Sequence, residues 1–202
     1  MQTLERIILA SGSPRRLELL ASLGLVVEVV PSDYDEPAMP DLTPVALAQT
    51  HAREKLAAVV RARTEFYAPI VAADTVVDVD GQALGKPRDD AEATQMLERL
   101  SGREHLVHTA FALALPGVDA RIEECETTRV RFHALSGDEI AEYVASGEPL
   151  DKAGAYGIQG RAAALVAGID GDFYTVMGFP LGRFIRALRQ LDLHVPAANV
   201  LS

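Results

Sequence analysis

An apolar run at residues 7–10, a small-residue turn and a helix start are the features that most constrain the N-terminal part of this chain. Ser13 is a favourable N-cap, and Pro14 suits the first helical position because its missing N–H would have no partner there. The pattern therefore predicts a strand over 7–10 and a helix over 14–23, which Gly24 ends. The free N–H groups and the dipole of such a helix start attract an anion.

Two arginines follow this helix start directly. A guanidinium binds a phosphate in a two-pronged geometry, so we expect Arg15 to bind a phosphate group. We expect Arg16 to contribute less, because successive helical side chains point in different directions. The same residues also fit an ordinary capped helix with two surface arginines.

Asp74 lies in the middle of an apolar strand pattern over residues 71–77. A buried carboxylate is costly without a partner, so this position requires a basic neighbour or a chemical role. Glu36, in an acidic loop, offers a second carboxylate, and Lys86 offers a cation. Without further information, Glu36 in solvent and Lys86 at the surface are the favoured interpretations, and Asp74 stays open.

The order and spacing of motifs over nearly the whole chain resemble the Maf family of nucleoside triphosphate pyrophosphatases. These motifs lie at residues 11–16, 32–36, 52–55, 73–76, 85–87, 100–103, 151–160 and 174–181. The resemblance implies an α/β fold with an elongated mixed β-sheet flanked by helices and two lobes around a central cleft (Maf/ITPase-like). It also implies hydrolysis between the α- and β-phosphates, which yields a nucleoside monophosphate and pyrophosphate.

The resemblance further implies roles for individual residues. Asp74 is expected as the proton acceptor, with Glu36 and Lys86 as further catalytic residues. Asp74 and Glu36 are also expected to hold a divalent metal ion, Mg²⁺ first and Mn²⁺ or Co²⁺ as alternatives, because phosphate and carboxylate oxygens suit a hard cation. The expected substrate-binding residues are Ser11, Ser13, Arg15, Lys55, Thr75, Lys152 and Gln159.

Residues 156–160 resemble the branch of the family that acts on dTTP and UTP. The Gln159 amide both donates and accepts, which suits the alternating groups of uracil and thymine. Two alternatives stay open. One is a pyrophosphatase specific for 7-methyl-GTP or for purines, and the other is a nucleotide-sensing regulator of cell division without turnover.

Composition narrows the class of protein. A net charge of −10 argues against a broad nucleic-acid surface, although a small anionic substrate needs only a local basic pocket. The single cysteine, Cys125, excludes an intrachain disulfide and is expected in a strand, and the five histidines lack metal-site spacing and are expected in strands or at the surface. No apolar stretch is long enough to span a bilayer and no signal peptide is visible, so a cytoplasmic location is expected. A homodimer stays open.

Periodicity and turn residues predict alternating elements in a single domain over residues 1–202. Helices are expected to start at Thr43, at Asp89 or Asp90, at Ser136 and at Pro180. Further strands are expected over 26–30, 70–79, 82–84, 105–115, 122–132, 163–169 and 173–176. This mixture, with a long central hairpin, predicts a mixed sheet instead of a purely parallel one.

Overall fold

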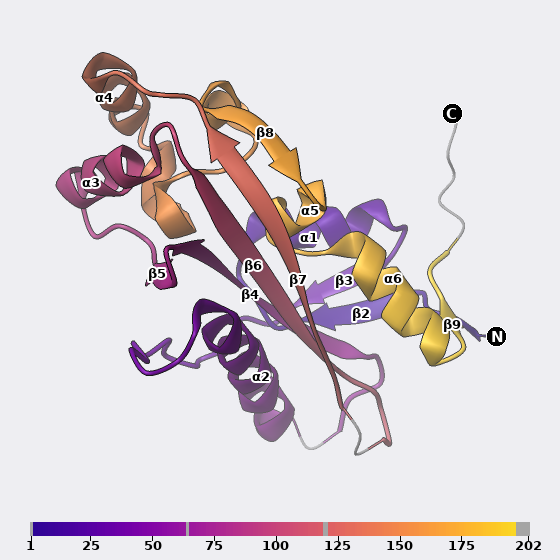
Figure 1. The fold of residues 1–202 in the computed structure, drawn as a ribbon. Coiled ribbons are helices and arrows are strands. Elements are labelled where there is room, and N and C mark those ends of the chain that lie inside the picture. Colours follow the sequence, from indigo (N-terminus) through magenta and orange to yellow (C-terminus); the bar gives the residue numbers. More distant parts are fainter. Residues whose placement is uncertain (1, 64, 119–120, 197–202) are drawn as a thin grey trace.

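The computed structural model of the chain describes residues 2–63, 65–118 and 121–196, and Figure 1 shows a long twisted sheet with helices on both faces. The strands are β1 (Gln2–Thr3), β2 (Arg6–Leu9), β3 (Val26–Val29), β4 (Ile70–Val79), β5 (Gln82–Leu84), β6 (Glu104–Ala114), β7 (Arg121–Phe132), β8 (Val166–Asp170) and β9 (Leu193–His194). The α-helices are α1 (Pro14–Ser22), α2 (Pro44–Ala62), α3 (Asp90–Leu100), α4 (Gly137–Ala145), α5 (Phe173–Met177) and α6 (Leu181–Gln190). Short 3₁₀ helices cover η1 (Glu148–Asp151), η2 (Ala153–Ala155) and η3 (Gly160–Ala164). Over these described residues, no helix is long and apolar enough to cross a membrane.

The main sheet is mixed, as the element pattern predicts. Within the described residues, seven strands take part, in the order β3-β2-β4-β6-β7-β8 with β5 added on β4. β3, β2 and β4 run parallel, and every other neighbouring pair is antiparallel. A separate parallel pair joins β1 to β9. The extent of the domain, residues 1–202, stays a prediction.

One face of β4 contributes side chains to two separate apolar cores. Side chains alternate between the faces of a strand, so residues of odd number in β4 share a face. Val71 and Ala73 pack into a core with α1 and α6, whereas Val77 and Val79 pack into a second core with α3 and α4. We call these two halves the N-terminal lobe and the distal lobe. Thr75 lies between them on the same face.

Helix α2 covers the opposite face of the sheet, where the even-numbered residues of β4 lie (Figure 1). Ala52 and Leu56 of α2 pack against Ala72 in a third apolar core. Asp74 lies on this face too, and only 5% of its surface is exposed. The alternation of β4 therefore directs two adjacent polar residues toward different helices.

The edge of β4 has a gap in its pairing. β2 pairs with β4 only at Ile70 and Val71, and β5 joins the same strand only from Val77 onward. In the part of the chain that the structure describes, residues 72–76 thus have no strand neighbour on this edge. The gap exposes the middle of the strand between the two lobes.

The prediction of a strand over 173–176 is wrong, because these residues lie in helix α5. Aromatic and β-branched residues favour a strand, but the capping residues decide the outcome. The Asp172 carboxylate accepts a hydrogen bond from the Thr175 N–H, and Gly178 ends the helix in a left-handed conformation.

Three smaller expectations also need correction. β8 starts at Val166, because residues 163–164 belong to η3. Ser13 does occupy the N-cap position of α1, but its side chain accepts no capping hydrogen bond; its N–H instead donates to Ser11 Oγ at 3.3 Å. His51 lies on α2 and is buried, so it is neither a strand residue nor a surface residue. Cys125 lies in β7, as predicted.

Substitution of Gly154 tests how closely the distal lobe packs against β4. It has a φ of +68°, and a Cβ at this position would lie 2.9 Å from Cγ2 of Val77. We expect Gly154→Ala to lower the free energy of unfolding by about 2–4 kcal/mol, since a left-handed backbone and an overpacked contact are both unfavourable. Chemical denaturation measures this change.

Gly81→Ala is the matched control. Gly81 has a similar φ of +79°, but a Cβ at this position would have no neighbouring atom within 4 Å among the residues that the structure describes. Gly81→Ala should lower the free energy of unfolding by about 1 kcal/mol, because only the backbone conformation is unfavourable. Equal losses in the two variants would contradict the close packing at Val77.

Candidate active site

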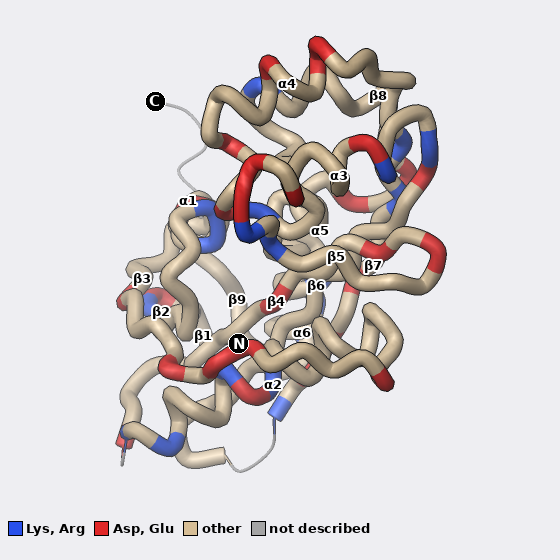
Figure 2. Tube along the Cα trace, turned by 90° about the vertical axis from the view of Figure 1, so that its left-hand side faces the viewer, with Lys and Arg blue, Asp and Glu red and all other residues tan. Residues whose placement is uncertain are grey.

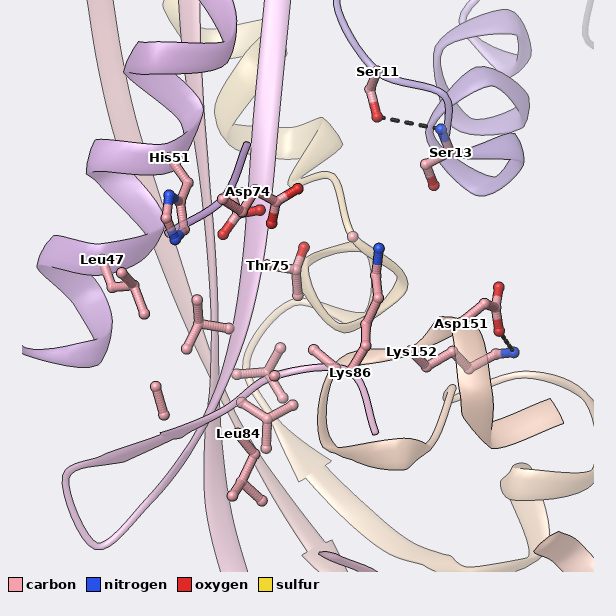
Figure 3. A pocket seen from close by; sticks show the side chains of 18 of the residues that line it. Ser11, Ser13, Leu47, His51, Asp74, Thr75, Leu84, Lys86, Asp151 and Lys152 are labelled. Carbon is pink, nitrogen blue, oxygen red and sulfur yellow. Dashed lines mark hydrogen bonds and ion pairs between the residues drawn. The ribbon is translucent and has the colours of Figure 1, made fainter. Parts of the chain in front are cut away.

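A cleft of about 1260 Å³ opens at the gap in β4, between the two lobes. Every site residue expected from the sequence lines it, although these residues come from distant parts of the chain: Ser11, Ser13, Arg15, Glu36, Lys55, Asp74, Thr75, Lys86, Lys152 and Gln159. Their chemical roles stay predictions. Figure 3 shows several of these side chains projecting from both lobes and from β4.

Lys55 is the centre of the acidic end of the cleft. Its Nζ lies 2.7 Å from Oδ1 of Asp74 and 2.8 Å from Oε1 of Glu36. Lys55 and Asp74 are both buried, so each offsets the cost of burying the other. Asp74 is therefore paired with a basic side chain, and Glu36 is more than a loop acid in solvent.

The position of Lys55 explains the acidity of Glu36. Burial alone raises the pKa of Glu36, but the hydrogen bond and the charge of Lys55 outweigh that effect. The pKa of Glu36 is consequently below its ordinary value. Its side chain is 45% exposed, so a ligand in the cleft can reach it.

Sequence reasoning missed His51, which lies one helical turn before Lys55 on α2. Its Nδ1 is 3.2 Å from the hydroxyl of Tyr34. Burial, followed by the negative charges of Glu54, Glu36 and Asp74, raises the pKa of Tyr34. The spacing of four residues between His51 and Lys55 is the signal that could have placed both on one helix face.

The two carboxylate oxygens of Asp74 differ in their contacts. Oδ1 accepts the hydrogen bond from Lys55, whereas Oδ2 accepts none from any residue that the structure describes. A general base needs such a free oxygen within reach of its substrate. The carboxylate points into the cleft beside His51 in Figure 3.

The acidic end also fits a divalent cation in part. Two carboxylates already converge on a single positive charge, the ammonium of Lys55. Among residues 2–63, 65–118 and 121–196, no group of three or more His, Cys, Asp or Glu residues could hold a metal ion. A Mg²⁺ ion would thus need oxygens from water and from a bound phosphate, which is its common arrangement.

The opposite end of the cleft is basic, and Figure 2 shows Lys and Arg residues gathered near the start of α1. Arg15 Nη1 lies 3.2 Å from Oδ2 of Asp151, and the other oxygen of Asp151 is 2.5 Å from the ammonium of Lys152. Lys86 follows β5 and projects into the cleft (Figure 3). These cations and the N-terminus of α1 form an environment for an anion.

Arg16 also lines this cleft, beside Arg15. Its Nη2 donates to Thr75 Oγ1 at 3.2 Å, and that oxygen is 3.0 Å from Thr109 Oγ1. Thr75 is therefore part of a polar network between α1, β4 and β6. Gln159, by contrast, is exposed, and within the described residues its side chain makes no hydrogen bond, which leaves its amide free for a ligand.

Known proteins are similar to this chain over most of its length. The family described as Maf-like protein matches residues 6–191. A protein named dTTP/UTP pyrophosphatase from Thermus thermophilus is 52% identical over 90% of this chain and 92% of its own. Proteins of the same name from Symbiobacterium thermophilum and Bacillus velezensis are 50% and 45% identical, over 93% and 94% of this chain and 94% and 98% of theirs. Among solved structures, the Staphylococcus aureus Ham1 protein matches with a TM-score of 0.45 at 15% identity, over 63% of this chain and 72% of that one.

The role of Lys55 can be measured through Glu36. We expect Lys55→Met to raise the pKa of Glu36, because burial is then opposed only by the smaller effects of Lys86 and His51. Carboxyl NMR titration measures this pKa. In the wild-type protein a lowered pKa means that the Glu36 carboxylate stabilises the fold above its unfolded pKa, and that this contribution disappears as the pH falls through the folded pKa. The variant should lose that contribution.

Lys86→Met is the control for this titration. Lys86 lowers the pKa of Glu36 through its charge alone, and less than Lys55 does. The variant should therefore raise that pKa by a smaller amount. A Glu36 pKa that stays the same in Lys55→Met would show that the contact is absent in solution.

Proposed function

The chain belongs to the Maf family, and from this premise we propose that it hydrolyses dTTP and UTP to the nucleoside monophosphate and pyrophosphate. The relatives are named dTTP/UTP pyrophosphatase, which supports dTTP and UTP as the substrates. The observation that carries the proposal is the cleft itself, which combines a free carboxylate oxygen on Asp74 with a basic end that suits a polyphosphate. Phosphoryl transfer needs these two properties in one site.

In the proposed reaction a water molecule attacks the α-phosphorus. Oδ2 of Asp74 accepts the proton of that water as its oxygen forms the new P–O bond. The bond between the α-phosphorus and the bridging oxygen breaks, and pyrophosphate leaves with the bonding electron pair. Lys86 and Lys55 offset negative charge that builds up on the phosphate oxygens.

We propose Mg²⁺ as the cofactor, held by Glu36 and Asp74 together with phosphate oxygens and water. When bound, the ion would neutralise phosphate charge and so favour nucleophilic attack. The ammonium of Lys55 lies between the same two carboxylates. Binding of the ion and the position of Lys55 are therefore linked, and the metal is expected to enter with the nucleotide.

We assign base recognition to Gln159 at the rim of the cleft. Its free amide can donate to a pyrimidine carbonyl and accept from the ring N–H. Thr75 acts on substrate choice in a less direct way, since its hydroxyl already contacts Arg16 and Thr109.

Asp74→Asn tests whether Asp74 is the general base of the reaction. The amide preserves the shape but cannot accept the proton, so we expect kcat for dTTP to fall by about a hundredfold or more, with nucleotide binding largely retained. Steady-state kinetics and equilibrium binding separate the two effects. Asp78→Asn is the control, because Asp78 lies on the same face of β4 outside the cleft. The asparagine Oδ1 can accept from the Gly81 N–H, and its Nδ2 can donate to Nε2 of a neutral His108. Turnover above about a tenth of the wild-type value in Asp74→Asn would remove Asp74 from this role.

A nucleotide panel with pyrophosphate detection, with and without Mg²⁺, tests the function and the base choice. The wild-type protein should hydrolyse dTTP and UTP well above GTP, ATP and 7-methyl-GTP. Gln159→Glu should lower the pyrimidine activity by about ten- to a hundredfold, because the carboxylate repels the base carbonyls.

Gln95→Glu introduces the same charge on the exposed face of α3, outside the cleft, and should leave the ranking of substrates unchanged. A preference of the wild-type protein for 7-methyl-GTP would refute dTTP and UTP as the substrates, but the proposed pyrophosphatase reaction would stand. Nucleotide binding without any turnover would instead favour a sensor.

A further inference from the structure

We propose that the buried pair of His105 and Tyr156 positions the segment 152–160, so that the amide of Gln159 stays at the rim of the cleft before a nucleotide binds. Both members of the pair are positioning residues, because they act through this segment and not on the reacting atoms. The inference rests on the proposed function for the role of Gln159. It deepens that role by naming what holds the amide in place.

The segment 152–160 forms part of the cleft wall, yet little regular structure supports it. Residues 156–159 lie between η2 and η3, outside any helix or strand. Directly before them, Gly154 and Ala155 have φ values of +68° and +62°. A left-handed backbone is unfavourable for alanine and persists only where neighbouring contacts enforce it. The segment therefore needs an anchor in a more rigid part of the fold.

Tyr156 supplies this anchor, because its side chain enters the core of the distal lobe. Its hydroxyl lies 2.6 Å from Nε2 of His105 on β6. The ring packs edge-on against His105 and against Phe132 of β7, with ring centroids 5.3 Å and 4.7 Å apart. Edge contacts of this kind have a preferred geometry, so they fix the orientation of the ring. The segment is thus tied to two neighbouring strands of the main sheet.

Tyr156 is the hydrogen-bond partner of His105. The other ring nitrogen, Nδ1, is buried and has no hydrogen-bond partner within the described residues. Burial lowers the pKa of His105 to about 4 and raises the pKa of Tyr156, so both side chains are neutral at pH 7. Without the tyrosine hydroxyl, both ring nitrogens would be unpaired in the core. Since unpaired buried polar groups are unfavourable, the bonded arrangement is favoured.

The effect of this anchor is directed toward Gln159. After Tyr156, Ile158 packs in the core of the N-terminal lobe, so the segment bridges the two lobes just before Gln159. On the other side of Tyr156, the N–H of Gly154 donates to the carbonyl of Gly85 at 2.9 Å. That bond holds the start of the segment independently. Loss of the anchor should therefore loosen mainly the residues from 156 onward.

Tyr156→Phe deletes the hydroxyl and keeps the ring. We expect KM for dTTP to rise about fivefold while kcat changes by less than about twofold, because a smaller fraction of the protein has the binding-competent arrangement and the groups at the α-phosphate stay in place. In a Gln159→Ala background the same change should have little further effect, since the pair acts through that amide. Hydrogen–deuterium exchange over residues 152–160 should become faster in Tyr156→Phe.

Thr127→Val is the matched control. Thr127 Oγ1 lies 2.8 Å from Nδ1 of His108, so this variant also removes a hydroxyl from a histidine of β6, but outside the cleft. It should change neither KM nor the exchange of residues 152–160. His105→Gln keeps a polar group that can pair with the tyrosine hydroxyl, so its KM should lie closer to the wild-type value than that of His105→Leu.

A merely structural role of the pair would lower the thermal stability of Tyr156→Phe without changing the KM of the folded protein, and that result would overturn the inference. The same conclusion follows if Tyr156→Phe raises KM by an equal factor with and without Gln159, or if a folded His105→Leu has the wild-type KM. A wild-type protein that hydrolyses no nucleotide would contradict the proposed function. Exchange over residues 152–160 then decides the inference: faster exchange in Tyr156→Phe but not in Thr127→Val supports it, and unchanged exchange overturns it.

Discussion

The cleft depends on one interruption in the backbone pairing of β4. β2 leaves this strand after Val71 and β5 joins it at Val77, so both faces of the stretch between them are open to the same space. Because side chains alternate along a strand, adjacent residues reach different surroundings. Asp74 meets Lys55 of α2, and Thr75 meets Arg16 of α1. A partner strand along this edge would separate the two environments, so the order of the strands decides what the site can bind.

The two ends of the cleft bury charge in opposite ways. At the acidic end, Lys55 is surrounded by carboxylates, and the pair with Asp74 is compensated without a ligand. At the basic end, Arg16 donates to three neutral oxygens, and Asp74 and Glu36 act on it through their charge alone. Under the proposed function, the polyphosphate would lie at the basic end, and its oxygens would reach toward the acidic end.

Local signals predicted much of the local structure, although the strand preference of residues 173–176 was overruled by their caps, and contacts between distant elements could not be predicted. Caps and turns are encoded nearby: Ser136 and Glu139 form the predicted capping box at the start of α4. Residues 173–176 look like a strand by composition, yet one N-cap and one glycine make them a helix. The contact between Lys55 and Glu36, and the position of Arg16 beside Thr75, depend on how α2, α1 and β4 pack, and no spacing in the sequence contains that information. The resemblance named residues that the fold brings together in one cleft, but it could not give their contacts.

Helix α6 closes the N-terminal lobe, and this affects the order in which the two cores can form. The core of this lobe joins Leu4 to Leu188, and β1 pairs with β9. The core of the distal lobe draws instead on buried residues between Val77 and Leu165, which leave the ribosome earlier. All buried residues of the distal core are therefore synthesised before α6, which packs with α1 in the other core. The carbonyl of Gly178 that orients Arg16 is synthesised after every buried residue of the distal core, so this end of the cleft is completed after the other.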